Sequence, residues 1–476
     1  MVVSAPKKPT TKDRAGSRTG RRSWLSWLFP IVVWQVVAIL FVELVLFWAG
    51  LGEEEIFKLD PELGTTHMTN KRITWRSEGY AQSYLNEDGM REPGLTVSKP
   101  PGTYRIALLG DSMVEGFQVP IEDTFGQILQ RRLSGHARPA VQVLNFGTSG
   151  YSTAQQYLQL KKQVLKYHPD LVVVCYNSRD MFENWTPADE VITNVRPMAL
   201  HLPGGKLVVH SYYVQRWMRS PRAKFLKSIE WLRQNSRIWG LIAALDLDLS
   251  MHSPLYRAAV SFFTKPKKAL QELRTAFASV SSWQPSFKIQ TFEDTDSPGG
   301  QKASQSNARG QKAAGDEHAA AVRDALAFNS AATNRVLEES PLAKATAAQK
   351  DGKQVYRELV ERTMGSLLAE MRSQCAKIGC KLAVVSLPVR SALCPTPGTD
   401  TEFNHIDYAG ELAMMSAICR ARAIPMLDCQ ALAQSLPMKQ RPKLFYAMHL
   451  SPAGHKFMAD AMYHFVAGEV APSRRR

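Results

Sequence analysis

A serine and a histidine, far apart in the chain, are the residues best suited to act together chemically. Ser112 belongs to the tripeptide Gly110-Asp111-Ser112, which directly follows the apolar segment 104–109. That segment predicts a strand, and α/β proteins place reactive groups at the carboxyl ends of their strands. The glycine allows a sharp turn that presents the serine at the rim of the sheet. Because the same residue types also form ordinary turns, the tripeptide alone does not establish a nucleophile.

His449 lies just before residues 452–467, which predict the last helix of the chain. A serine and a proline at the start of that helix suit its cap and its first turn. A loop before a helix and the end of a strand can meet at one edge of a sheet. His449 is therefore a candidate general base for Ser112. Gly150 follows the second predicted strand, and its backbone N–H is a candidate oxyanion donor.

Around these residues, short apolar runs alternate with longer amphipathic segments. The alternation is typical of β–α–β units and predicts an α/β fold, with a parallel sheet and helices on both faces. The predicted strands are residues 104–109, 141–145, 171–175, 381–387 and 424–427, and the predicted helices are residues 124–133, 154–166, 356–378, 408–421 and 452–467.

Taken together, the three blocks resemble the SGNH (GDSL-type) hydrolase family. The tripeptide at Ser112 matches the first block of that family. Gly150 stands at the position of its oxyanion glycine, and His449 matches the histidine of its last block. The stretches 86–91 and 104–165 resemble membrane-anchored, extracytoplasmic members. This resemblance, which implies a flavodoxin-like three-layer α/β/α fold (the SGNH hydrolase fold), covers residues 84–184 and 354–468.

The resemblance implies a serine esterase, an O-acyltransferase or a deacetylase that acts on ester bonds. In that chemistry Ser112 attacks an acyl carbon and His449 accepts its proton, while the N–H groups of Ser112 and Gly150 hold the oxyanion. Family and location point to an acylated substrate of the cell envelope, either a glycan such as a polysaccharide or a lipid. The sequence contains no metal-ligand spacing and no phosphate-binding loop, so we expect neither a metal nor another cofactor.

The third block departs from the family pattern. It reads Asn177-Ser178-Arg179-Asp180, so Arg179 stands where the family has its oxyanion asparagine. A guanidinium can donate to the oxyanion in its place or bind an anionic group of the substrate. Asn177, two residues earlier, is a second candidate donor.

The last block departs from the family as well. Ala447 and Tyr446 occupy the positions where the family has an aspartate, so His449 has no carboxylate partner in its own block. A backbone carbonyl is one replacement for that acid, and Asp428 is a remote one. The altered blocks leave a second interpretation open, in which an SGNH domain without turnover binds a glycan or a protein partner.

Residues 24–52 are long and apolar enough to form one transmembrane helix, and tryptophans lie near both ends. Seven basic residues precede this segment and three glutamates follow it. The positive-inside rule then places residues 1–23 in the cytoplasm and the catalytic domain outside, as in a single-pass membrane protein. A cleaved signal peptide is the alternative, and two arginines before the segment faintly resemble a twin-arginine export signal.

The net charge of +16 does not indicate nucleic-acid binding. Residues 1–22 contribute +6 and the last three arginines contribute +3, which leaves +7 spread over the rest of the chain. A charge spread so thinly is typical of a solvated surface, and basic and aromatic residues do not interleave.

The predicted organisation follows from these segments. It comprises a basic tail (1–23), a transmembrane anchor (24–52), an irregular lead-in (53–103), two parts of the hydrolase-like domain (104–190 and 351–470) and an insertion between them (191–350). The insertion is expected to hold a hairpin near Gly204-Gly205, an amphipathic stretch (225–251), a low-complexity loop (297–314) and a helix (318–337). Six cysteines leave disulfide pairing open, with Cys375 and Cys380 as one conceivable pair.

Overall fold

The computed structural model describes the chain in several stretches. These are residues 25–49, 51–52, 55–76, 78–92, 95–136, 140–178, 180–184, 196–201, 206–242, 245, 352–395 and 408–470. The predicted low-complexity loop and the helix after it, residues 297–337, lie outside the described residues.

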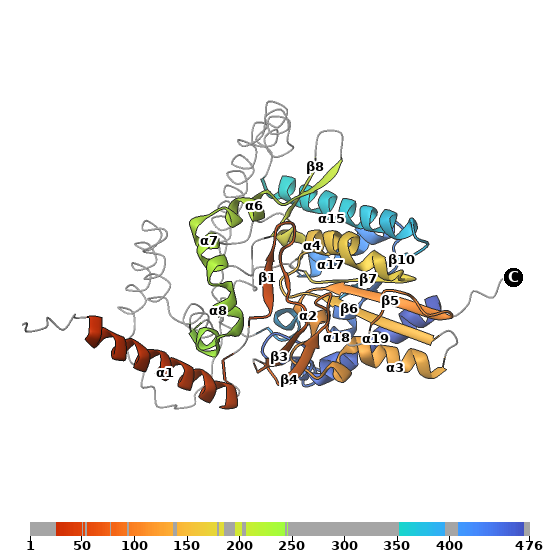
Figure 1. The fold of residues 1–476 in the computed structure, drawn as a ribbon. Helices are drawn as coiled ribbons and strands as arrows, with labels where there is room; N and C mark the ends of the chain where they lie inside the picture. Colours follow the sequence, from red (N-terminus) through yellow and green to blue (C-terminus); the bar gives the residue numbers. More distant parts are fainter. Residues whose placement is uncertain are drawn as a thin grey trace, which may run out of the picture.

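A five-stranded parallel sheet forms the core of the domain (Figure 1), as the sequence predicts. Its strand order is β11-β10-β7-β5-β6. The strands are β5 (Thr103–Gly110), β6 (Ala140–Gly147), β7 (Leu171–Tyr176), β10 (Lys381–Ser386) and β11 (Met426–Asp428). β5 and β6 are paired along their whole length, with Gly110 opposite Gly147. The loops that follow these two strands therefore leave the sheet side by side.

Helices cover both faces of the sheet, which confirms the three-layer α/β/α fold (Figure 1). One face carries α4 (Thr153–Gln159), α15 (Gly352–Ala376) and α17 (Tyr408–Ala421), and the other carries α3 (Phe125–His136), α18 (Cys429–Gln434) and α19 (Pro452–Val470). Ala107 and Leu109 of β5 pack under the first set of helices. Their neighbours Ile106 and Leu108 pack under the second set. Because both faces are buried, the strands form nearly continuous apolar runs in the sequence.

A buried histidine joins α19 to α3. His455 of α19 accepts the N–H of Phe125, the first residue of α3, through Nδ1 at 3.2 Å. The two rings stack with their centroids 5.8 Å apart. Burial lowers the pKa of His455 to about 3, and the charges of Arg91 and His449 act in the same direction. His455 is therefore neutral at neutral pH, so its Nδ1 is able to accept that N–H.

The expectation that the lead-in, residues 53–103, is irregular is wrong. It forms two antiparallel hairpins, β1 (Phe57–Asp60) with β2 (Gly64–His67) and β3 (Lys71–Trp75) with β4 (Ala81–Leu85). Ile73 and Leu85 pack with Ile56 and Phe117 in a small core of their own. Each strand has only four or five residues; β2 consists of glycine, threonine and histidine, and the other three strands are partly accessible to solvent. Their composition therefore resembles that of a polar loop.

The described part of the insertion also has regular structure. β8 (Met198–His201) and β9 (Leu207–His210) form the predicted hairpin. They are followed by α6 (Tyr212–Met218), α7 (Pro221–Ser228), α8 (Glu230–Asn235) and a further helical stretch, residues 237–242. We call residues 211–242 the helical arm. In Figure 1, α7 and α8 lie between α1 and the sheet.

The N-terminal helix α1 (Leu25–Ala49) matches the predicted apolar segment. Residues Leu28–Ala49 have a mean hydropathy of 2.5, and none of this stretch is buried by the rest of the protein. A helix of 22 residues is long enough to cross a bilayer. An anchor and a signal sequence share these properties.

All six cysteines are free thiols, and five of them are buried. Neither the conceivable pair Cys375–Cys380 nor another disulfide forms. The buried cysteines act as small apolar side chains of the core.

Candidate active site

The turn after β5 presents Ser112 at the carboxyl edge of the sheet. Asp111 caps the short helix α2 (Ser112–Glu115), since its side chain accepts the N–H of Met113 at 2.9 Å. Gly110 leaves no room for a side chain, because a Cβ there would lie 2.3 Å from Cγ2 of Val114. Ser112 is thus the first residue of a helix, a position where the backbone N–H has no partner within the helix.

His449 reaches Ser112 from the loop before α19. Its Nε2 lies 2.9 Å from Ser112 Oγ, a hydrogen-bond distance. The loop folds back on itself, because the N–H of Tyr446 donates to the carbonyl of His449 at 2.9 Å and the N–H of Ser451 donates to the carbonyl of Leu444 at 2.9 Å. The structure therefore brings together the predicted serine and histidine, which lie 337 positions apart in the sequence.

Glu78, a residue that the sequence reasoning missed, contacts the other side of the histidine ring. Its Oε2 lies 3.2 Å from His449 Nδ1. The same oxygen accepts the backbone N–H of Met448 at 2.9 Å and that of His449 at 3.0 Å. Burial alone would raise the pKa of Glu78. The hydrogen bonds from His449 and Met448, with the charge of His449, outweigh burial and leave this pKa below its usual value. The carboxylate is therefore ionised at neutral pH.

The turn between β3 and β4 positions Glu78. Glu78 has a positive φ of 51°, which is uncommon for a residue with a side chain. Gly79 follows with a φ of 113°, and a Cβ there would lie 2.4 Å from the carbonyl oxygen of Gln118 and 3.1 Å from the ring of Tyr446. The turn thus packs tightly against the loop that carries His449.

Asp428, the remote acid considered from the sequence, serves another purpose. Its Oδ1 accepts the N–H of Ala431 at 2.9 Å and the hydroxyl of Ser386 at 2.9 Å. It thereby caps α18 and ties that helix to β10. The carboxylate that contacts His449 is that of Glu78 instead, 371 positions away in the sequence. The missing acid of the last block is a signal that a partner lies elsewhere, but no local pattern marks Glu78 as that partner.

Gly150 lies in the loop after β6, beside the Ser112 turn. The N–H of Thr148 donates to the carbonyl of Gly110 at 3.0 Å, which ties this loop to the end of β5. The N–H of Ser149 donates to Oε1 of Glu115 at 3.0 Å. Gly150 is exposed and has a φ of 74°, a conformation that favours glycine. The loop is thus anchored on both sides of the Ser112 turn, by β5 and by α2.

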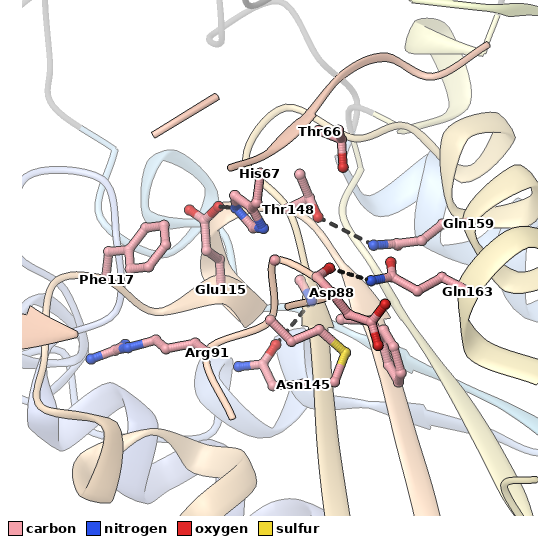
Figure 2. A pocket seen from close by; sticks show the side chains of 14 residues that line it. Thr66, His67, Asp88, Arg91, Glu115, Phe117, Asn145, Thr148, Gln159 and Gln163 are labelled. Carbon is pink, nitrogen blue, oxygen red and sulfur yellow. Dashed lines mark hydrogen bonds and ion pairs between the residues drawn. The ribbon is translucent and has the colours of Figure 1, made fainter. Parts of the chain in front are cut away.

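Glu115 is buried behind this loop and pairs with His67 of the lead-in. Their Oε1 and Nε2 atoms lie 2.5 Å apart, and Glu115 is 2% exposed. Figure 2 shows the small polar cavity beside them, where the side chain of Gln159 bonds Thr148 at 3.3 Å. Neither Ser112 nor His449 lines this cavity. Its lining residues support the loop of Gly150 from behind.

Residues 86–91, which resemble membrane-anchored members of the family, have a structural role next to the site. The side chain of Asn86 accepts the N–H of Met90 at 2.9 Å, which forms a tight loop. Arg91, at the end of that loop, is 4% exposed and donates to the backbone carbonyls of Gly116 and Val119. A buried guanidinium thereby fixes the chain that leaves α2, and with it the orientation of the Ser112 turn.

The third block contributes Asn177 to the site. Its side-chain amide donates to Oδ2 of Asp111 at 2.8 Å, so it links the end of β7 to the Ser112 turn. Arg179, the residue in the place of the family asparagine, lies outside the described residues. Burial raises the pKa of Asp180 well above its usual value, and the hydroxyl of Thr153 donates to it at 3.1 Å.

Comparison with known proteins is consistent with this geometry. Residues 108–259 match the GDSL-like Lipase/Acylhydrolase family. The chain contains a GDSL-like hydrolase domain. The matched residues include Ser112 and Gly150 and end before His449, so the match accounts for the first part of the domain.

Individual relatives align more weakly. An arylesterase from Vibrio mimicus is 31% identical over 90 residues, which is 19% of this chain and 44% of the arylesterase. The chain thus spans less than half the length of this curated relative. A lipase/acylhydrolase from Enterococcus faecalis has a TM-score of 0.33 and 11% identity, over 78% of this chain and 99% of that one. A catalytic mutant of an acetylxylan esterase from Geobacillus stearothermophilus has a TM-score of 0.31 and 9% identity, over 79% and 97%.

Proposed function

We propose that the protein is a serine esterase whose triad is Ser112, His449 and Glu78. The observation that carries this proposal is the continuous contact from Ser112 Oγ to His449 Nε2, at 2.9 Å, and from His449 Nδ1 to Glu78, at 3.2 Å. This is the arrangement by which a weak hydroxyl becomes a nucleophile, with a base beside it and an acid that orients the base. The GDSL-like match supports the same reaction class.

The reaction proceeds in two halves. Ser112 Oγ forms a bond to the acyl carbon of the ester while His449 Nε2 takes the hydroxyl proton. The bond to the leaving alcohol then breaks, and His449 returns the proton to that alcohol, which leaves an acyl-serine. Water, or a hydroxyl of a second substrate in an acyl transfer, attacks the acyl carbon while His449 again takes the proton. The bond to Ser112 Oγ then breaks, His449 returns the proton to that oxygen, and the acid or the new ester leaves. Glu78 stays ionised throughout and stabilises the imidazolium that forms in each half.

The backbone N–H groups of Ser112 and Gly150 are the proposed oxyanion donors. Both come from loops that leave the sheet side by side, at the ends of β5 and β6. Arg179, which stands in the place of the family's oxyanion asparagine, is the proposed third donor. Arg179→Ala should then lower kcat by about 10²–10³-fold, the usual cost of one oxyanion donor, and leave KM unchanged. A rise in KM alone would instead assign Arg179 to an anionic group of the substrate.

The proposed substrate is an acylated glycan or lipid of the cell envelope. Helix α1 is long and apolar enough to anchor the chain. The excess of basic residues before it favours a cytoplasmic N-terminus and an extracytoplasmic domain. Reporter fusions placed after residue 52 test this orientation. A reporter enzyme that works only outside the cytoplasm should be active in such a fusion, and an inactive reporter would contradict the orientation.

The esterase proposal is tested with a fluorophosphonate probe, which reacts with activated serines. The wild-type chain should be labelled and should hydrolyse p-nitrophenyl acetate, and Ser112→Ala should abolish both. Ser435→Ala, at an exposed serine that ends α18, is the matched control and should keep both. Folded wild-type protein that neither takes the label nor hydrolyses the ester would instead favour a domain that binds a glycan or a protein partner without turnover.

A further inference from the structure

We propose that the helical arm, residues 211–242, lies on the outer surface of the membrane, with Trp231 and its apolar neighbours among the lipids. This inference rests on the proposal that α1 is a membrane anchor. The proposed binding partner of the arm is a membrane surface that contains anionic phospholipid.

The first observation is a set of large apolar side chains that the protein leaves uncovered. Trp231 is 75% exposed and Phe225 is 60% exposed, and Leu232, Leu241 and Ile242 are exposed as well. α7 buries Ala223 and Leu226 on its other side. The arm therefore buries some of its apolar side chains against the protein and leaves other large apolar side chains exposed. Exposed apolar surface of this kind marks an interaction site.

The second observation is that the arm contacts the anchor itself. Glu43 lies inside α1, and its carboxylate accepts the N–H of Arg237 at 2.7 Å and that of Ile238 at 3.3 Å. Glu43 also accepts the hydroxyl of Ser236, so it caps the helical stretch 237–242. The one acidic side chain within α1 is thus paired with the start of a helix from the arm. This pairing reduces the free-energy cost of a carboxylate within a membrane-spanning segment.

The position of Glu43 sets the level of the arm along the axis of α1. It lies six residues before the end of α1 at Ala49, which is roughly 9 Å along a helix axis. A segment that contacts Glu43 must therefore lie at the level of the last turns of the anchor. If α1 crosses the bilayer, that level is the lipid–water interface, the region that tryptophan prefers.

The end of α1 and the residues after it contact the arm closely. Arg237 donates to the carbonyl of Gly52 at 2.9 Å and places its guanidinium 5.7 Å from the ring centroid of Phe47. Gly52 has a φ of 78°, and a Cβ there would lie 2.3 Å from the carbonyl oxygen of Arg237. This close approach requires a glycine, so the contact between arm and anchor is specific.

The other side of the arm is fixed to the body of the protein. Arg233, 7% exposed, forms an ion pair with Glu55. Lys71 of β3 donates to the carbonyl of Gln234 at 2.9 Å. In Figure 1, α7 and α8 run across the direction of α1, and α8 is the nearer of the two to its C-terminal part. The arm thus has the orientation of an interfacial helix if α1 crosses the bilayer.

The exposed basic residues of the arm favour contact with anionic lipids. Lys224 and Lys227 of α7 and Arg216 and Arg219 before it are exposed. Basic residues next to exposed aromatic and aliphatic side chains are typical of helices that lie in the headgroup region of anionic membranes.

The test measures the depth of spin labels in the full-length protein, reconstituted in vesicles of phosphatidylcholine and phosphatidylglycerol. Cysteines replace Trp231 in the arm, Leu40 in α1 and Met438 in the loop after α18, all three exposed, in a Cys394→Ser background. The labels at 231 and 40 should collide more with oxygen, which concentrates in lipid, than with a water-soluble nickel complex. The label at 438 should show the reverse preference.

The outcomes separate the arm from the anchor. A label at 231 that behaves like the one at 438, while the label at 40 is in lipid, overturns the inference and leaves the anchor intact. A label at 231 shielded from both reagents shows a protein partner or a second copy on the arm, and also overturns it. If the label at 40 is in water as well, the anchor proposal itself fails. Lys224→Glu with Lys227→Glu should move the label at 231 toward water, whereas Lys439→Glu should not.

Discussion

A carboxylate that accepts two backbone N–H groups as well as a histidine is held in a single orientation. Glu78 is such a carboxylate, and it holds the loop of His449 and the imidazole ring at the same time. An aspartate in the last block would share the loop of the histidine. Glu78 instead belongs to a different hairpin, so the geometry of the site depends on how that hairpin docks.

Glu78→Gln should lower kcat on p-nitrophenyl acetate by about 10³–10⁴-fold with little change in KM. The amide keeps an acceptor for the backbone N–H groups but no longer stabilises the imidazolium, and loss of this function costs about 10⁴ in another triad enzyme. Steady-state kinetics measure the effect. Glu62→Gln, at an exposed glutamate of the same lead-in, is the control and should behave as wild type. Equal activity of the two variants would remove Glu78 from the triad.

Ser112 and His449 are predictable from the sequence, whereas Glu78 is not, and the reason is physical. Ser112 and His449 sit in short blocks whose local pattern points to a strand end and to a loop before a helix. Glu78 has no such pattern, because its contact with His449 exists only once two segments 371 positions apart have packed. The direction of Asn177 also follows from packing, since its amide turns to Asp111.

At the scale of elements, the lead-in is a structural part of the domain. Its β2 contributes His67, which bonds the buried Glu115 of α2, and Glu115 in turn holds Ser149 beside Gly150. One hairpin thus supports the loop of Gly150, and the other supplies Glu78 to the proposed triad. The strands of the central sheet are evident from sequence because they are apolar on both faces. The lead-in strands are not, because they are short and partly exposed.

His67→Ala should lower the free energy of unfolding by about 1–3 kcal/mol, because it leaves the buried Glu115 with an unmet hydrogen bond. Urea unfolding measures the change. His464→Ala, at an exposed histidine of α19, is the control and should have a much smaller effect. In the double variant His67→Ala with Glu115→Gln, the loss should be less than the sum of the single losses, since the two side chains interact. Simple additivity would contradict the coupling.

The contact between α19 and α3 should make stability depend on pH through His455. Its pKa is about 3 in the folded protein, below the ordinary value of 6.5. As the pH falls below 6.5, the unfolded chain binds a proton that the folded chain does not, so stability is lost. The loss is about 1.4 kcal/mol for each pH unit, until the pH nears the folded pKa. His455→Gln keeps an acceptor for Phe125 without titrating. It should therefore show a shallower fall in stability between pH 6.5 and 4.5 by urea unfolding, and an unchanged slope would contradict this.

At the scale of the whole molecule, the sequence predicts the fold of the domain and the N-terminal apolar helix. The alternating pattern predicts the three-layer fold, and the apolar segment predicts α1. The contact between Glu43 and the arm is not predictable in this way, because it joins positions 193 to 195 residues apart. What sequence reasoning misses here are contacts between elements, whereas the elements with strong hydrophobic patterns are found.

Removal of α1 should leave activity unchanged, whereas removal of the lead-in as well should abolish it. A chain that starts at residue 53 keeps Glu78 and both hairpins, so it should hydrolyse p-nitrophenyl acetate with the kcat of the full chain. A chain that starts at residue 95 lacks Glu78 and His67 and should be inactive. Circular dichroism establishes that each shortened chain is folded before its activity is compared. Equal activity of two folded chains would show that the lead-in is dispensable for catalysis.

In the proposed triad, the wide spacing of Ser112, His449 and Glu78 makes activity a late event in the synthesis of the chain. Glu78 and Ser112 are synthesised well before His449, which follows Ser112 by 337 positions in the loop before α19. A chain that is still being synthesised or exported therefore carries a serine with no base beside it, and that serine is unreactive toward the esters it meets on the way. A prematurely terminated chain, or one clipped before α19, stays inert for the same reason.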